Sequence, residues 1–300
     1  MKKLLLNLAV IMTATALFSC TGNADNNAEG NDSAAAEQTE ATAGVNPFPW
    51  DFPQNVKIEA EPDQLVLAPY TFYPRAIKEG EDLNEKILIF YHTNMAEVGE
   101  TKSKLKGDVE VPNSLIIPLD KDGQAKKGDI LLTWWQNGSG LKRAIVKDAS
   151  NPAEPVVDYL DMSYSDDPEK PGSAQRNADK QLKPGSFNVI TDGEWQSGAQ
   201  VACKSERGKW DAGILIHEQD GKVLVLGFSD KVKAYNKADV KLIPFKETIK
   251  VGDMVYAKWV ASYEDGYKVT KIDQNLGRIW VEKDGKTEIK AFGEVTKTLN

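Results

Sequence analysis

The stretch that decides the fold is Lys250-Val251-Gly252-Asp253-Met254-Val255-Tyr256-Ala257-Lys258-Trp259, followed by Asp265-Gly266-Tyr267 and Val269. A Gly-Asp turn precedes a short strand that ends in a small residue, and an aromatic residue follows that strand. The Asp-Gly turn then leads into a second strand. Weaker copies of this pattern occur upstream, so the sequence predicts a small β unit that is repeated along the chain.

The rest of the chain from residue 56 onward has the pattern of an all-β protein. Apolar residues alternate or form short runs, and Gly, Asp, Asn or Pro interrupts them about every six to twelve residues. Four segments share the same order of features, and the first strand of each ends in a small residue. These first strands are Leu65–Ala68, Ile130–Thr133, Gln200–Cys203 and Met254–Ala257. A small residue at one recurrent position indicates tight packing there, and it predicts a buried, inert thiol for Cys203.

The same reading predicts three further strands in each unit. The second strands are expected at Tyr73–Ile77, Leu141–Ile145, Trp210–Ile214 and Gly266–Thr270. The third strands are expected at Ile87–Tyr91, Val156–Tyr159, Val223–Phe228 and Arg278–Val281. The fourth strands are expected near Val109–Ile117, Ser186–Ile190, Val240–Ile243 and Thr287–Ala291. In the second unit, the polar and proline-rich segment Asp161–Lys183 predicts a long exposed loop between the third and fourth strands.

A second level of repetition groups the units into pairs. Ile116-Ile117-Pro118-Leu119 leads to Lys127-Gly128-Asp129, just as Leu242-Ile243-Pro244-Phe245 leads to Val251-Gly252-Asp253. The sequence therefore predicts two tandem pairs, at residues 47–192 and 193–300. A unit of about 50–60 residues buries too little surface to be very stable alone, so each pair is expected to unfold as one block.

Gly-Asp-x-Val-x-Ala-x-Trp, a short Asp-Gly turn and an aromatic-led strand together resemble Tudor and Agenet domains, which are small SH3-like barrels. The resemblance is best over residues 252–299 and fair over 198–246. It implies ligand cages built from one aromatic after the first strand and others at the end of the third. The first position falls on Tyr70, Trp135 and Trp259, and Ser205 breaks the pattern in the third unit. The third-strand positions fall near Tyr91, Tyr159, Phe228 and Trp280.

The aromatic side chains allow more than one use. Cage aromatics with the nearby Asp161 could hold a cationic or methylated amine through cation–π contacts. A row of exposed rings could instead stack on sugars. Any one ring, including those of the pair Trp134-Trp135, could also simply pack in the core or between barrels.

The chain begins with the features of an export signal. Lys2-Lys3 precedes the apolar run Leu4–Phe18, which is too short for a standard membrane-spanning helix. Leu17-Phe18-Ser19-Cys20 resembles the lipobox of bacterial lipoproteins; the alternative is a plain secretory signal. The resemblance implies a signal peptide at residues 1–19, a lipid on Cys20, and, because Thr21 is not Asp, anchoring in the outer membrane. Which face of that membrane the protein occupies stays open.

The segment after the signal has the composition of a tether. Residues 20–46 are rich in Asn, Ala, Glu, Thr and Gly, and such a segment cannot bury enough apolar surface to offset its ordering entropy. We therefore expect a disordered linker. The aromatic and proline-rich segment Val45–Phe52, which contains Trp50, is expected to dock onto the folded body.

Charge and motif content narrow the function classes. The formal charge is −8, and it becomes −10 when the signal peptide takes Lys2 and Lys3 away, which argues against a nucleic-acid partner. The sequence shows no zinc-ligand spacing, no nucleophile motif and no phosphate-binding loop. We therefore expect no cofactor, no metal and no catalysis. The enzymatic alternative would use His92 or His217 with a carboxylate between barrels.

These observations favour a lipid-anchored, non-enzymatic protein of the cell envelope. The preferred interpretation is that its aromatic-lined barrel surfaces bind a protein or peptide partner. The alternative from another class is a protein that binds the cell wall or surface glycans.

Overall fold

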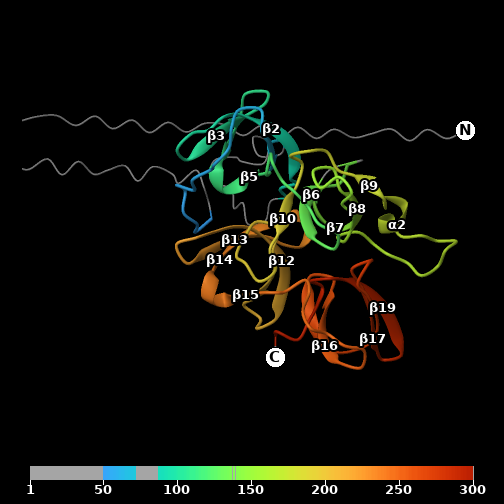
Figure 1. The fold of residues 1–300 in the computed structure, drawn as a ribbon. Coiled ribbons are helices and arrows are strands. Elements are labelled where there is room, and N and C mark those ends of the chain that lie inside the picture. The colour runs from blue at the N-terminus through green and yellow to red at the C-terminus, as the bar shows by residue number, and fades with distance from the viewer. Residues whose placement is uncertain (1–49, 72–86, 137, 139, 300) are drawn as a thin grey trace, which may run out of the picture. The chain divides into compact units, whose positions relative to one another are not determined.

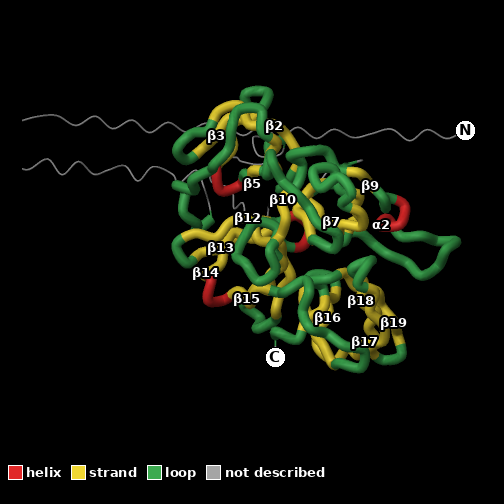
Figure 2. Tube along the Cα trace, in the orientation of Figure 1, coloured by secondary structure: helices red, strands yellow, loops and turns green. Residues whose placement is uncertain are grey.

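The computed structural model describes residues 50–71, 87–136, 138 and 140–299. One compact unit spans Val45–Asn300. The signal peptide, Cys20, the tether and the strand expected at Tyr73–Ile77 lie outside the described residues. The structure is 45% strand and 6% helix, which confirms the predicted all-β class (Figure 2).

Four repeats of five antiparallel strands make up this part of the chain (Figure 1). Repeat 1 contains β1 (Leu65–Ala68), β2 (Tyr91–Glu97), β3 (Lys102–Leu105), β4 (Val109–Pro112) and β5 (Ile117–Pro118). Repeat 2 contains β6 (Ile130–Trp134), β7 (Leu141–Asp148), β8 (Val156–Tyr159), β9 (Lys180–Gln181) and β10 (Asn188–Ile190). Repeat 3 contains β11 (Gln200–Lys204), β12 (Trp210–Gln219), β13 (Lys222–Leu226), β14 (Val232–Asn236) and β15 (Val240–Leu242). Repeat 4 contains β16 (Met254–Trp259), β17 (Ser262–Asp273), β18 (Arg278–Lys283), β19 (Lys286–Ala291) and β20 (Val295–Thr296).

The strand order is the same in all four repeats. The fifth strand pairs with the first, and the first, second, third and fourth strands then follow as a meander. Short helices lie in some of the connections. They are η2 (Asn113–Leu115), α2 (Ser173–Arg176), η3 (Phe228–Asp230) and η4 (Lys237–Asp239). This shared order agrees with four small barrel-like units.

Each second strand is bent by a β-bulge, so that its first part pairs with the first strand and its later part with the third. The extra residues are Ala96, Lys147, Ile216 and Thr270. The small residues near the ends of the first strands lie opposite the beginning of the second strands. All four are buried: Ala68, Thr133, Cys203 and Ala257. The predicted recurrent packing position is therefore confirmed.

A turn before each first strand is tied to the bulge in the second strand. The first residue of the turn has a left-handed backbone in every repeat: Asp63, Gly128, Gly198 and Gly252. Its N–H donates to the carbonyl of the residue just before the bulge, at 2.8, 2.8, 2.9 and 2.8 Å, these residues being Met95, Val146, Leu215 and Val269. The N–H of that residue donates back to the next turn residue at 2.9 Å each time. The Gly-Asp signal that opens repeat 4 is thus an architectural element.

Contacts are found within each of the two pairs of repeats, between repeats 1 and 2 and between repeats 3 and 4. In the second pair, β12 and β17 are joined by the register Trp210↔Tyr263 and Asp211↔Ser262, which merges repeats 3 and 4 into one ten-stranded sheet. In the first pair, the N–H of Gly140 donates to the carbonyl of Phe90 at 3.0 Å, and the rings of His92 and Trp134 stack at 4.2 Å. Both pairs bring the first hairpin of the later repeat against the second strand of the earlier one.

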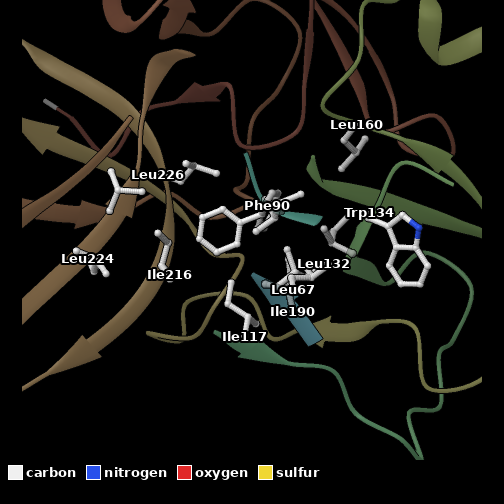
Figure 3. Packing of buried hydrophobic residues seen from close by; sticks show 14 of the residues in the cluster. Leu67, Phe90, Ile117, Leu132, Trp134, Leu160, Ile190, Ile216, Leu224 and Leu226 are labelled. Atoms are coloured by element: carbon white, nitrogen blue, oxygen red, sulfur yellow. The ribbon is translucent and has the colours of Figure 1, made fainter. Parts of the chain in front are cut away.

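The two pairs also contact each other extensively. His217 Nε2 lies 2.8 Å from the carbonyl of Ile116, and Arg278 donates to the carbonyls of Tyr159 and Leu160. Figure 3 shows apolar side chains of repeats 1, 2 and 3 converging around Phe90, and they belong to one buried cluster. We therefore expect one cooperative body in place of two independently unfolding pairs.

The segment before repeat 1 docks as predicted. Trp50 and Phe52 are buried, and Trp50 Nε1 donates to the carbonyl of Val232 at 2.8 Å. The contact joins the start of the described chain to repeat 3, 182 residues away.

Several predicted strand positions are wrong. Ile87–Tyr91 is not a third strand, because Tyr91 begins β2 and lies opposite Ala68. The segments near Asn188 and Val240 form the fifth strands β10 and β15, because the true fourth strands, β9 and β14, are short or weakly apolar and escape a periodicity reading. The expected long loop Asp161–Lys183 contains α2 and β9.

The interface between repeats 2 and 4 can be tested with two glycines of similar backbone. Gly277 and Gly208 have φ of 62° and 74°. A Cβ added at Gly277 would lie 2.8 Å from Leu160 Cδ2, whereas a Cβ added at Gly208 would have no neighbouring atom within 4 Å. Gly208→Ala should cost about 1–2 kcal/mol of unfolding free energy from backbone strain alone. Gly277→Ala should cost about 1–3 kcal/mol more because it also overpacks the interface. Urea unfolding of both variants measures this difference, and equal losses would contradict close packing at Gly277.

Candidate functional site

The largest convergence of unusual features in repeats 2, 3 and 4 is a groove around Phe228. A cavity of about 220 Å³ is lined by side chains of all three repeats, among them Arg143, Asp161, Gln200 and Asp230. A neighbouring cavity of about 270 Å³ lies at the mouth of repeat 3, over Cys203 and Tyr235. The two cavities share a common wall made of Ala212, Gly227, Phe228, Ser229 and Ala261, and we name them together the Phe228 groove.

The local sequence explains why Phe228 projects into solvent. After β13 the chain reverses through Gly227, whose N–H donates to the carbonyl of Lys231 at 2.8 Å. Ser229 and Asp230 inside this reversal both have a left-handed backbone, with φ of 57° and 55°. The reversal leaves the Phe228 ring 57% exposed although it is apolar.

A second strained loop lies on the other side of the groove. Val260 lies between β16 and β17 with φ of 53° and is 58% exposed. A left-handed conformation is a genuine outlier for a β-branched residue, and such outliers concentrate at binding and switch sites. Two strained loops and two exposed apolar side chains therefore border one groove.

The floor of the groove is a buried ion pair. Asp161 accepts three hydrogen bonds from Arg143, from the backbone N–H at 2.6 Å, Nε at 2.8 Å and Nη2 at 2.5 Å. Burial alone would raise the pKa of Asp161, but the Arg143 guanidinium outweighs burial and lowers it to about 2. Arg143 Nη1 also donates to Gln200 at 2.7 Å, which ties repeat 2 to repeat 3. Asp161 is thus already neutralised by the protein and is no free counter-ion for an amine.

A second ion pair closes the side of the groove. Lys258, which lines the groove, lies 2.9 Å from Glu294. Burial opposes ionisation of Glu294, but Lys258 and the N–H of Ala291 together lower its pKa. Asp230 differs from these carboxylates, because burial raises its pKa and only the more distant Lys142 opposes that effect.

Of the eight predicted ligand-binding residues, Asp161 and Phe228 meet in this groove. The structure places the other six elsewhere. Tyr70 and Tyr91 face each other edge to face in repeat 1, with ring centres 6.1 Å apart. Tyr159 is fully buried, and its hydroxyl accepts from the N–H of Gln136 and donates to the carbonyl of Trp134.

The tryptophans of the predicted cages differ in their exposure. Trp135 is half-buried, lies against Gly138 and donates from Nε1 to Asn177 at 3.1 Å. Trp280 is buried and donates from Nε1 to Asp166 in the insertion of repeat 2. Trp259 alone of the three has an exposed ring, at 50%.

Lysines of the protein itself lie over several of these rings. Lys290 lies 5.8 Å from the ring centre of Trp259, and Lys271 lies 3.9 Å from that of Trp280. Tyr267, Trp195 and Trp210 have similar lysine contacts. A cationic ligand at these faces would first have to displace an intramolecular cation.

The side chains of His92, His217 and Cys203 are held in the fold by stacking, hydrogen bonding or burial. His92 stacks on Trp134, and burial is the main cause that lowers its pKa. His217 contacts the carbonyl of Ile116, and burial lowers its pKa as well. Cys203 is buried as predicted, and burial raises the pKa of its thiol.

Within the described part of the chain, no group of three or more His, Cys, Asp or Glu side chains is placed to hold a metal ion. None of the helices in that part of the chain has the length and apolar character needed to cross a bilayer.

The comparisons with known proteins add no relative. The sequence matches no protein-family model, and it matches no curated protein at a significant level.

Sequence reasoning missed most of the groove. Arg143, Gln200, Asp230 and Val260 all line it, and none of them belongs to a recognisable motif. The one available signal was Val260 between two predicted strands, where a turn would ordinarily carry Gly or Asn.

The ion pair on the floor predicts a defined acid dependence of stability. The pKa of Asp161 is about 2 in the folded state and near 3.8 when unpaired. The pair therefore stabilises the fold fully above pH 4, by roughly 2 kcal/mol, and this contribution disappears as the pH falls from about 4 to about 2. Chemical unfolding at a series of pH values measures the loss.

The variant Asp161→Asn removes the carboxylate whose titration causes this acid dependence. The variant leaves the Arg143 charge buried without a partner, so it should lose about 3–5 kcal/mol at pH 7 and lack the corresponding decline below pH 4. Asp51→Asn is the matched control, because Asp51 pairs with Lys222 on the surface and should change little. An Asp161→Asn variant that keeps the full acid dependence would contradict the assignment.

Proposed function

We propose that this protein is a lipid-anchored, non-enzymatic protein of the cell envelope that binds a protein or peptide partner in the Phe228 groove. The observation that supports this most strongly is the exposed Phe228 ring between two cavities that share one wall. An aromatic anchor beside concave, partly polar surface is the usual centre of a protein interface. The proposed ligand-binding site is then this one groove and not several separate aromatic cages.

The two ion pairs of the groove favour binding over catalysis. Arg143 is committed to Asp161, and Lys258 to Glu294, so these groups are fixed by the fold. Fixed pairs favour a preorganised surface, whereas general acid–base catalysis needs groups free to exchange protons. The strained loops at Ser229 and Val260 hold the apolar side chains outward at a cost in backbone energy.

The envelope location rests on the sequence Leu17-Phe18-Ser19-Cys20 and on Thr21 after it. Attachment through Cys20 and sorting to the outer membrane are proposed on that basis. The proposal assigns no cofactor, metal or nucleic acid to the protein.

Photocrosslinking in intact cells tests the partner site. Phe228 replaced by benzoylphenylalanine, which keeps a ring at that position, should give protease-sensitive adducts of higher mass. Benzoylphenylalanine at Val251 should give no adducts, because Val251 is 64% exposed but lies outside the groove. Equal adducts at both positions, or none at Phe228, would refute the groove as the site. Adducts whose added mass is removed by glycan hydrolases would identify a glycan partner.

Metabolic labelling tests the anchor separately. The parent chain should incorporate a clickable palmitate analogue and sediment with membranes. Cys20→Ser should lose the label and appear in the soluble fraction, whereas Cys203→Ser should keep it because Cys203 is buried in β11. Retention of label by Cys20→Ser would overturn the lipoprotein assignment without bearing on the groove.

A further inference from the structure

The cavity at the mouth of repeat 3 contains a lysine at a position where the strand pattern calls for an apolar residue. Side chains alternate between the two faces of a strand, so Lys233 and Tyr235 of β14 share one face. Tyr235 packs against the buried cluster of repeat 3, and Lys233 lies opposite the buried Val225 of β13. Lys233 therefore stands on the inner face of repeat 3, at its open end. A charge at a core-facing position is uncommon unless it has a function.

The polar groups of Lys233 and Tyr235 are accessible and unpaired. Both residues line the cavity of about 270 Å³, and the side chain of Lys233 is exposed. Among the described residues, no carboxylate forms an ion pair with Lys233, and no group forms a hydrogen bond with the Tyr235 hydroxyl, whose oxygen is not among the buried unpaired atoms. Burial is the main cause that raises the pKa of Tyr235, so its hydroxyl keeps its proton at neutral pH. Two donors therefore face the cavity without acceptors.

The charge of the cavity walls favours an anionic group over a cationic one. The charged residues in the lining are Lys231, Lys233 and Asp211. Asp211 already accepts a hydrogen bond from the Ser262 hydroxyl at 2.6 Å. The lining thus has a surplus of positive charge, although the chain as a whole has a formal charge of −8. This local surplus is complementary to an acidic ligand.

We propose that the mouth of repeat 3 binds a carboxylate of the peptide partner, which accepts hydrogen bonds from Lys233 Nζ and the Tyr235 hydroxyl. Hydrogen bonds to ionised groups are stronger than those between neutral groups. The exposed Phe228 ring lies in the wall of the same cavity, so an apolar side chain next to the carboxylate packs on it. The assignment rests on the proposed function, because the cavity is one part of the Phe228 groove, and it adds the chemistry of the partner.

The size of the cavity limits what enters it. With a water occupying about 30 Å³ of liquid volume, 270 Å³ corresponds to roughly nine waters. This volume suits an Asp or Glu side chain, or the last residue of a peptide with its free carboxylate. The rest of the peptide then lies outside the mouth of repeat 3, across Phe228 and toward the cavity over Arg143.

Selection of random octapeptides on the full-length protein tests the proposal, with one library ending in a free carboxylate and one in an amide. We expect the bound peptides to combine an apolar residue with a carboxylate. Enrichment of Asp or Glu in both libraries would assign the site to an acidic side chain, and binding from the free-carboxylate library alone would assign it to a chain terminus.

The outcomes separate this inference from the proposed function. Peptides that bind the parent and not Phe228→Ser, yet show no preference for a carboxylate, would overturn the inference and leave the groove as the partner site. Peptides that bind Phe228→Ser as tightly as the parent would contradict the groove itself. No bound peptide from either library would contradict both.

Fluorescence anisotropy with a selected peptide then locates the carboxylate. Lys233→Gln and Tyr235→Phe should each weaken binding at least about tenfold, that is about 1.4 kcal/mol, and Lys233→Arg should bind more tightly than Lys233→Gln because it keeps the cation. Lys209→Gln is the matched control, because it removes an exposed lysine of the same repeat that does not line the cavity. Thermal melts identify any variant that fails to fold, and the exposed position of Lys233 keeps the test valid if Tyr235→Phe does. Unchanged affinity in a folded Lys233→Gln variant would overturn the proposal.

Discussion

The structure depends on one reciprocal pair of backbone hydrogen bonds, made four times. In each repeat a left-handed turn residue donates to the strand just before a bulge, and that strand donates back. The pair extends the ladder between the first and second strands to the point where the second strand bends. The bend lets one strand serve two neighbours, and so a unit with only five short strands can enclose a core. Gly252 and its three counterparts matter because the left-handed backbone alone brings their N–H into place.

The parts of the fold that follow from local chemistry were predictable. Gly252-Asp253 and the small residue Ala257 indicated the repeats and their first strands. The fourth strands were not predictable, because β9 has two residues and β14 carries a mixed pattern whose packing depends on distant partners. The misplaced third strand of repeat 1 has a related cause. Residues 69–90 separate β1 from β2 in the sequence, and the apolar run near Phe90 has the pattern of a strand although it precedes β2.

The candidate site was predicted only in part for the same physical reason. Phe228 followed from its position after a third strand, and Asp161 from its position after another. Contacts between repeats bring Phe228 and Asp161 into one groove. Arg143 and Gln200, for example, are 57 residues apart in the sequence, and no local sequence pattern predicts that they form a hydrogen bond. The aromatic residues also had competing uses. The protein places its own lysines on rings such as Trp259, so composition suggested cages where the structure shows intramolecular cation–π contacts.

The contacts of the segment around Trp50 determine which repeat would first bear a pulling force. This segment precedes repeat 1 in the sequence, yet Trp50 bonds to Val232 and Asp51 pairs with Lys222, both in repeat 3. A few residues later, the carbonyl of Val56 accepts from Asn113 in repeat 1. Tension applied from the N-terminal side therefore reaches repeat 3 first, and repeat 1 carries load only after that attachment has yielded. A chain whose anchor lay on the N-terminal side would be held by its third repeat and not by its first.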